Sequence, residues 1–321
     1  MDAGGQVVEL GDGVRPEFVD VDVPGGKLRT ARWGDGGQTV LGIHGVTASS
    51  LSLAPVARHL AEHHHLLAPD LRGRGASGRL PGPFGMEAHA RDCAEVLEAL
   101  GSGPAVVVGE SMGGYVAVVL AARFPERVER LVLVDGGLPP PLSPGLDPGA
   151  VVEAVLGPAL ARLGTVFGSE AEYLDFWRAH PSFSEGLSDD IEAYLLYDLE
   201  PVAGGFRSRV SEAAVREDSA QTLQDPEVIT DALNALRCPI SLLRAERGLL
   251  NQSEPLLPEA VVAEWRSVLP QLVDEIVPDT NHYTLMFGAT GAAEIARLAF
   301  GTGPDRSSLA APSAQPGGQH V

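Results

Sequence analysis

The segment Ala105-Val-Val-Val-Gly109-Glu110-Ser111-Met112-Gly113 carries the strongest structural signal in the chain. Its beginning, Ala105 to Val108, is a short apolar run typical of a buried strand, and the apolar stretch Met112 to Arg123 predicts a helix. The last five residues match Gly-x-Ser-x-Gly, in which the glycines permit a tight turn that lifts the serine oxygen clear of the sheet. The segment therefore predicts a nucleophile at Ser111, with the Met112 amide at the helix start free to bind an oxyanion.

The sequence on both sides of this segment alternates between strand and helix patterns. Runs of β type around Pro24-Gly25-Gly26 predict a hairpin, and continuous apolar strands separated by helices predict a mainly parallel sheet covered on both faces. The predicted strands are Glu17–Val23, Leu28–Trp33, Thr39–Ile43, Leu66–Ala68, Pro104–Val108, Leu131–Val134, Ile240–Arg244 and Leu272–Val277, and the predicted helices are Met86–Leu100, Met112–Arg123 and Ala292–Phe300. The fold class is therefore expected to be α/β, with a doubly wound sheet.

A long insert interrupts this alternation. It opens at Pro139-Pro140-Pro141, runs to about Arg237, and contains helix-like patterns with aromatic residues but no clear strand. We therefore expect a core of residues 1–138 and 238–300 and a helical cap, or lid, of residues 139–237. Residues 301–321 are rich in Gly, Pro and Ser without an apolar period, which predicts a disordered tail.

The overall composition narrows the possible function classes. The chain has 23 Lys and Arg against 43 Asp and Glu, a formal net charge of −20, which argues against nucleic-acid binding and against a polybasic membrane anchor. Residues 1–5 are acidic and Gly-rich, unlike a secretory signal. Two cysteines, Cys93 and Cys238, provide neither a disulfide framework nor a metal cluster. We expect a cytoplasmic monomer or homodimer whose partner is a small-molecule substrate, with no nucleic acid and no membrane.

The nucleophile needs further groups to become reactive. A serine requires a base, and the base requires an acid that orients it. His282 lies between the last predicted strand and the last predicted helix, and no other histidine occurs between His180 and His320. His282 is therefore the candidate general base.

These residues together resemble the α/β-hydrolase superfamily, of the type with a helical cap, over roughly residues 17 to 300. Besides the nucleophile turn, His44-Gly45 after a predicted strand resembles the family's oxyanion motif. Residues 69–77, PDLRGRGAS, resemble its D-x-R-G-x-G-x-S loop, and residues 123–128 resemble the segment that leads into the next strand. The resemblance implies an α/β-hydrolase fold, the chain order serine, acid, histidine, and the backbone amide of Val46 as a second oxyanion donor.

The acid departs from the family's usual pattern. Where we align the aspartate of many relatives, after the strand Ile240–Arg244, this chain has Gly248. Asp135 is the first candidate, because some superfamily members place their acid at the end of this earlier strand. Glu246, the carboxylate in the later loop, is the alternative.

The predicted chemistry is acyl transfer to water. Ser111 would attack the carbonyl and His282 would move the protons, with no metal or organic cofactor required. A carboxylic ester or lactone of a small to medium hydrophobic substrate is the expected target. Alternatives on the same scaffold are a carbon–carbon bond hydrolase, a thioesterase, a cofactor-free haloperoxidase, or a non-catalytic ligand-binding protein. The candidate substrate contacts are His44, Gly45, Glu110 and Tyr283.

Overall fold

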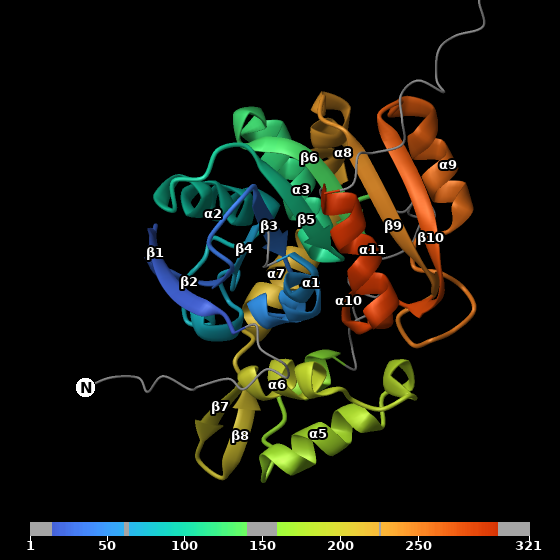
Figure 1. The fold of residues 1–321 in the computed structure, drawn as a ribbon. Coiled ribbons are helices and arrows are strands. Elements are labelled where there is room, and N and C mark those ends of the chain that lie inside the picture. The colour runs from blue at the N-terminus through green and yellow to red at the C-terminus, as the bar shows by residue number, and fades with distance from the viewer. Residues whose placement is uncertain (1–14, 61–63, 140–158, 225, 301–321) are drawn as a thin grey trace, which may run out of the picture.

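The computed structural model describes residues 15–60, 64–139, 159–224 and 226–300. Within these residues, eight strands form one sheet in the order β1-β2-β4-β3-β5-β6-β9-β10 (Figure 1). The strands are β1 Glu17–Val23, β2 Gly26–Trp33, β3 Thr39–Ile43, β4 His65–Pro69, β5 Ala105–Glu110, β6 Val128–Val134, β9 Ile240–Arg247 and β10 Leu272–Asn281. Strand β2 runs antiparallel to both neighbours, and the remaining pairs are parallel. The expected α/β class with a mostly parallel sheet is confirmed.

Side chains of the central strands point alternately to the two faces of the sheet and form a hydrophobic layer on each face. On β5, Ala105 and Val107 pack into one buried cluster while Val106 and Val108 pack into the other. The first cluster lies under α2 Met86–Ala99, α3 Met112–Arg123, α8 Pro226–Ala235 and α9 Glu259–Val268, and the second under α1 Ala54–Leu60, α10 Thr284–Phe287 and α11 Ala289–Phe300. Both faces of the sheet are thus covered, which explains the uninterrupted apolar runs in its central strands.

Much of the insert lies beside the core, at the bottom of Figure 1, whereas its helix α7 Glu212–Gln224 contacts α2 of the core. Its described elements are α5 Glu170–Arg178, α6 Asp189–Tyr197, β7 Leu199–Val202, β8 Gly205–Ser208 and α7 Glu212–Gln224. The hairpin β7–β8 corrects the expectation that the insert contains no strand. Each of its strands has four residues, Pro201 interrupts the first, and neither alternates cleanly between buried and exposed positions. The periodicity on which a strand prediction depends is therefore missing.

The last helix of the insert packs on the core. Helix α8 contacts α3, and Ile229, Ala232 and Leu233 belong to the same cluster as the strand residues. Packing thus joins α8 to the core, although the expected cap range of 139–237 includes it. The predicted tail, residues 301–321, lies outside the described residues. No helix in the described parts of the chain has the length and apolarity needed to cross a bilayer.

Short 3-10 turns complete the described elements, and the first two of them lie in loops at the carboxyl edge of the sheet. They are η1 Ser50–Leu53, η2 Gly75–Ser77, η3 Pro125–Arg127 and η4 Pro181–Phe183. All strands but β2 share one direction, so the loops after β3, β4, β5, β6, β9 and β10 meet at this edge. This edge faces the cap. Ligands of open α/β sheets bind at the carboxyl ends of the strands, so this edge is where a site is expected.

Candidate active site

Ser111 occupies the sharp turn between β5 and α3. Its φ of 53° is in the left-handed region, which non-glycine residues rarely adopt and which marks a constrained turn. A Cβ on Gly109 would lie 2.4 Å from the Gly113 carbonyl oxygen, and a Cβ on Gly113 would lie 2.1 Å from the Ile43 oxygen. Both outer residues of Gly-x-Ser-x-Gly must therefore be glycine for this turn to form.

His282 and Asp135 meet at the carboxyl edge of the sheet. His282 directly follows β10, and Asp135 directly follows β6 at a φ of 47°. His282 Nδ1 lies 2.7 Å from Asp135 Oδ2. The Ala245 amide donates to Asp135 Oδ1 at 3.3 Å, which fixes the carboxylate. Burial alone lowers the pKa of His282, but the hydrogen bond and charge of Asp135, together with the charge of Glu110, raise the pKa above its ordinary value.

The alternative acid lies elsewhere. Glu246 is exposed at the end of β9, and its Oε2 accepts the Asp279 amide at 2.8 Å. Its carboxylate therefore stabilises the irregular end of β10. Of the two candidate acids, the structure brings Asp135 to His282.

Asn281 shapes the loop that carries His282, although it is not among the site residues predicted from the sequence. Its Oδ1 accepts the amides of Tyr283 at 3.0 Å and Thr284 at 2.9 Å, and its Nδ2 donates to the cap carbonyl of Ser182 at 3.1 Å. An Asn at the start of a turn that bonds amides two and three residues ahead is ordinary turn and capping chemistry, so this signal was present in the sequence.

The loop after β3 carries the predicted oxyanion motif. His44 is fully buried, its Nε2 accepts the Leu71 amide at 3.0 Å, and its Nδ1 lies 2.8 Å from the Gly45 oxygen. Burial lowers the pKa of His44 to about 3, so the ring is neutral and its Nδ1 proton is donated to Gly45. The ring ties two loops together and does not line the cavity, contrary to its expected contact with substrate, whereas Gly45 and Val46 do line it.

Glu110 lies next to both Ser111 and His282. Its carboxylate is 3.4 Å from His282 Nε2, and it accepts the Gly45 amide. Burial raises the pKa of this carboxyl, and the nearby charge of His282 and the Gly45 amide offset only part of that effect. The imidazole is thus placed between two carboxylates, Asp135 on Nδ1 and Glu110 on Nε2.

A cavity of about 220 Å³ separates these residues from the cap. Ser111, His282, Glu110 and Tyr283 line its polar side, and Tyr283 packs its ring 6.1 Å from that of Trp177 on α5. Its apolar walls include Val46, Ala48, Phe176, Trp177, Tyr194, Leu249, Leu250, Leu256, Met286 and Phe287. Three of these side chains are substantially exposed and form what we call the apolar rim: Phe176, Leu250 and Leu256 are 41%, 50% and 37% exposed.

Arg162 is a buried cation at the cavity that the sequence analysis missed. Its Nη1 lies 2.7 Å from Asp198 Oδ2 and donates to the Tyr173 hydroxyl at 2.6 Å, and its guanidinium lies 5.2 Å from the centroid of the Trp177 ring. No local motif marks it, because its partners come from distant positions of the insert. Across the described ranges, no three or more His, Cys, Asp or Glu side chains are grouped to hold a metal ion.

Comparisons with known proteins show the family to which the chain belongs. The family model for the alpha/beta hydrolase fold matches residues 38–289. The chain is 25% identical to 2-(acetamidomethylene)succinate hydrolase of Mesorhizobium japonicum, over 77% of this chain and 82% of that protein. It is 31% identical to Esterase Rv0045c of Mycobacterium tuberculosis, over 72% of this chain and 74% of that protein. The solved structure of E-2-(acetamidomethylene)succinate hydrolase matches with a TM-score of 0.73 and 23% identity, over 88% and 98% of the two chains. This chain is therefore a member of the α/β-hydrolase family.

Proposed function

We propose that this hydrolase is a serine esterase that cleaves a neutral carboxylic ester or lactone of small to medium size through an acyl-enzyme. The observation that carries the proposal is the 2.7 Å contact between His282 and Asp135, with Ser111 lining the same cavity as the imidazole. A serine on a strained turn beside a histidine that a buried carboxylate orients is the arrangement that makes a hydroxyl nucleophilic.

The reaction proceeds in two halves. Ser111 Oγ attacks the carbonyl carbon while His282 Nε2 takes its proton, and the Val46 and Met112 amides bind the oxyanion, each contributing about 2.7–4 kcal/mol of transition-state stabilisation. His282 then gives the proton to the leaving alcohol. In the second half His282 activates water, which attacks the acyl-enzyme and releases the acid. Throughout, Asp135 holds the imidazole in one tautomer and stabilises its cation.

The charges around the cavity support a neutral substrate. Arg162, the cation in the lining, is already paired with Asp198, and Glu110 adds a carboxylate beside His282. The Mesorhizobium relative is named for a succinate derivative. A substrate carboxylate in this cavity would have to compete with Asp198 for Arg162 and would be repelled by Glu110. The apolar walls instead favour a hydrophobic acyl or alcohol group.

The proposal is tested by intact-mass measurement after incubation with a small fluorophosphonate. Wild type should gain one adduct, and Ser111→Ala should gain none. Ser52→Ala, which removes another serine of the same cavity, should still gain one. Steady-state rates should then be measured on neutral esters and lactones and on the same esters carrying a terminal carboxylate. We expect Ser111-dependent turnover with the neutral series preferred. Folded protein that forms no adduct and hydrolyses no ester would contradict the proposal and favour a ligand-binding protein.

A further inference from the structure

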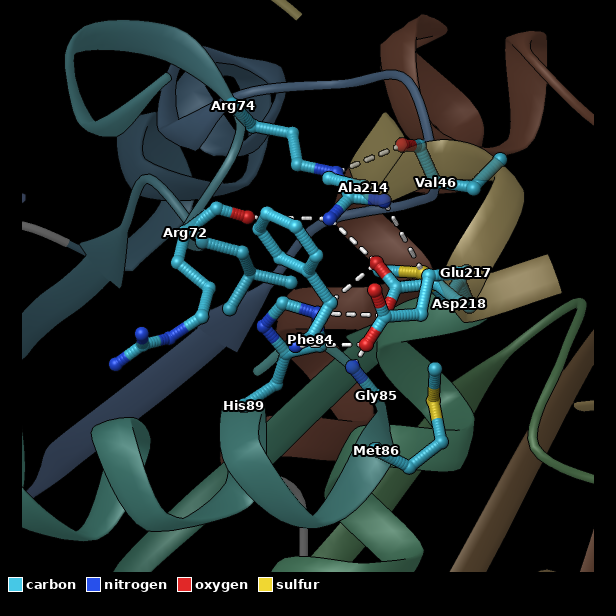
Figure 2. Close-up of polar contacts among 12 residues, drawn as sticks. Val46, Arg72, Arg74, Phe84, Gly85, Met86, His89, Ala214, Glu217 and Asp218 are labelled. Atoms are coloured by element: carbon cyan, nitrogen blue, oxygen red, sulfur yellow. Dashed lines mark hydrogen bonds and ion pairs between the residues drawn. The ribbon is translucent and has the colours of Figure 1, made fainter. Parts of the chain in front are cut away.

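A buried cluster of charged side chains joins the cap to the core at helix α7 (Figure 2). Asp218 on α7, Arg74 in the loop after β4 and His89 on α2 are all 0% exposed. Asp218 Oδ2 lies 2.5 Å from Arg74 Nη1 and 3.0 Å from His89 Nε2. Burial alone would raise the pKa of Asp218, but bonds and charges from His89 and Arg74 lower it below the ordinary value, so the carboxylate is ionised.

Arg74 extends from this cluster to both residues proposed as oxyanion donors. Its Nε donates to the Val46 carbonyl at 3.0 Å, its Nη1 donates to the Arg72 carbonyl at 3.1 Å, and its Nη2 lies 3.9 Å from Met112 Sδ. A guanidinium is planar, and its five N–H groups point in fixed directions. The plane of Arg74 therefore holds the Val46 carbonyl beside the Met112 side chain at the start of α3.

The cap fixes Asp218 in turn. Three side chains of α7 accept the three consecutive amides at the start of α2: Glu217 from Phe84 at 3.2 Å, Asp218 from Gly85 at 2.5 Å, and Gln221 from Met86 at 2.8 Å. Amides at a helix start have no partner within the helix, and negative charge there is favourable. Helix α7 is thus attached to the core at the point from which Asp218 reaches Arg74.

We propose that Asp218 of the cap is a positioning residue for the oxyanion site, acting through Arg74 on Val46 and Met112. This inference rests on the proposed hydrolase function. Stabilisation of an oxyanion requires donors that are already in place when charge develops, and displacement of a donor by a fraction of an ångström weakens it. Without Asp218 the buried guanidinium would lack its counter-charge and would reorient toward other acceptors.

The molecule provides a matched control for the test. Arg72 and Asp92 form a second buried ion pair between the same loop and α2, with Nε to Oδ2 at 2.7 Å and Nη2 to Oδ1 at 2.8 Å. The remaining bonds of the Arg72 side chain go to the carbonyls of Pro81 and Pro24, away from Val46. Disruption of this pair should destabilise the core to a comparable extent without moving the oxyanion loop.

The experiment measures kcat, KM and Tm for Asp218→Asn and Asp92→Asn. It also includes two double variants, Arg74→Met with Asp218→Leu and Arg72→Met with Asp92→Leu. A protein in which apolar side chains replace a buried ion pair often remains well folded. We expect Asp218→Asn and the Arg74→Met and Asp218→Leu double variant to lose about 10- to 100-fold in kcat with little change in KM. Complete loss of one oxyanion donor lowers kcat by about 10²–10³-fold. Inhibition by a boronic acid should weaken in parallel, whereas the Asp92 variants keep their kcat.

Two results would overturn the inference. One is an equal kcat in the Asp218 and Asp92 variants at matched loss of Tm. The other is an Arg74→Met and Asp218→Leu double variant that folds and retains full kcat. Failure of the proposed function would be recognised separately. In that case wild type and Ser111→Ala would hydrolyse esters at the same negligible rate.

Discussion

Replacement of Glu110 by Gln should move the acidic limb of the pH profile to lower pH. The Glu110 carboxylate favours the protonated form of His282, 3.4 Å away, and its charge raises the pKa of that imidazole. Gln has nearly the same shape and keeps an oxygen that can accept the Gly45 amide, but it carries no charge. His282 should therefore lose its proton at lower pH and become available as the base there.

The contact distance sets the size of this shift. Two unit charges 3.4 Å apart attract by about 5 kcal/mol at an effective dielectric constant of ~20, which corresponds to about 3.6 pH units at 1.36 kcal/mol each. Each charge is spread over several atoms, and Asp135 continues to stabilise the imidazolium, so this value is a ceiling. We expect the acidic limb to move down by less than this ceiling, because the hydrogen bond and charge of Asp135 raise the pKa of His282 more than the charge of Glu110 does.

The assay is kcat/KM against pH for a neutral ester, because that ratio reports the ionisation of the free enzyme. Glu246→Gln is the control: it removes a carboxylate that bonds the Asp279 amide and makes no contact with His282, so its profile should coincide with that of wild type. An acidic limb that stays in place in Glu110→Gln, or moves to higher pH, would refute the assigned electrostatic role of Glu110.

Two further predictions concern the buried carboxylates. Asp135→Asn should lower kcat by about 10⁴-fold with the fold intact, because an amide permits the wrong tautomer of His282. Single-turnover kinetics measure the rate and circular dichroism measures the fold. A loss in kcat of less than tenfold would exclude Asp135 as the acid. Tyr197→Phe removes the hydroxyl that donates to buried Asp70 Oδ2 at 2.6 Å. It should lower the free energy of unfolding by about 1.5–3 kcal/mol in urea titrations, and an unchanged midpoint would contradict that.

The sheet was predictable wherever its strands are buried on both faces. Strand β5 and helix α3 follow the expected boundaries closely, since an apolar run between glycines has few alternatives. Edge strand β10 extends four residues beyond the predicted Val277, to Asn281. Pro278 and the polar residues Asp279, Thr280 and Asn281 give no apolar pattern. An edge strand tolerates proline because one side of it needs no partner.

The candidate reactive residues could be proposed from the sequence because the turns that hold them are local, whereas the residues that support them could not. Ser111 and His282 are marked by the turns that hold them, and the end of β6 marks Asp135. Arg162 and Asp218 lie in the insert, and their partners are distant in sequence. Such pairs obey no spacing rule, so tertiary packing alone reveals them.

In the proposed esterase, the apolar rim would affect how substrates with different acyl chains are distinguished. Phe176, Leu250 and Leu256 are in contact with water and also line the cavity, so a hydrocarbon chain leaves water at the entrance before its carbonyl reaches Ser111. Each methylene transferred contributes about 0.8 kcal/mol, or about fourfold in the occupancy of the encounter complex. In the proposed esterase, selectivity for chain length would then be set by this partition equilibrium at the apolar rim.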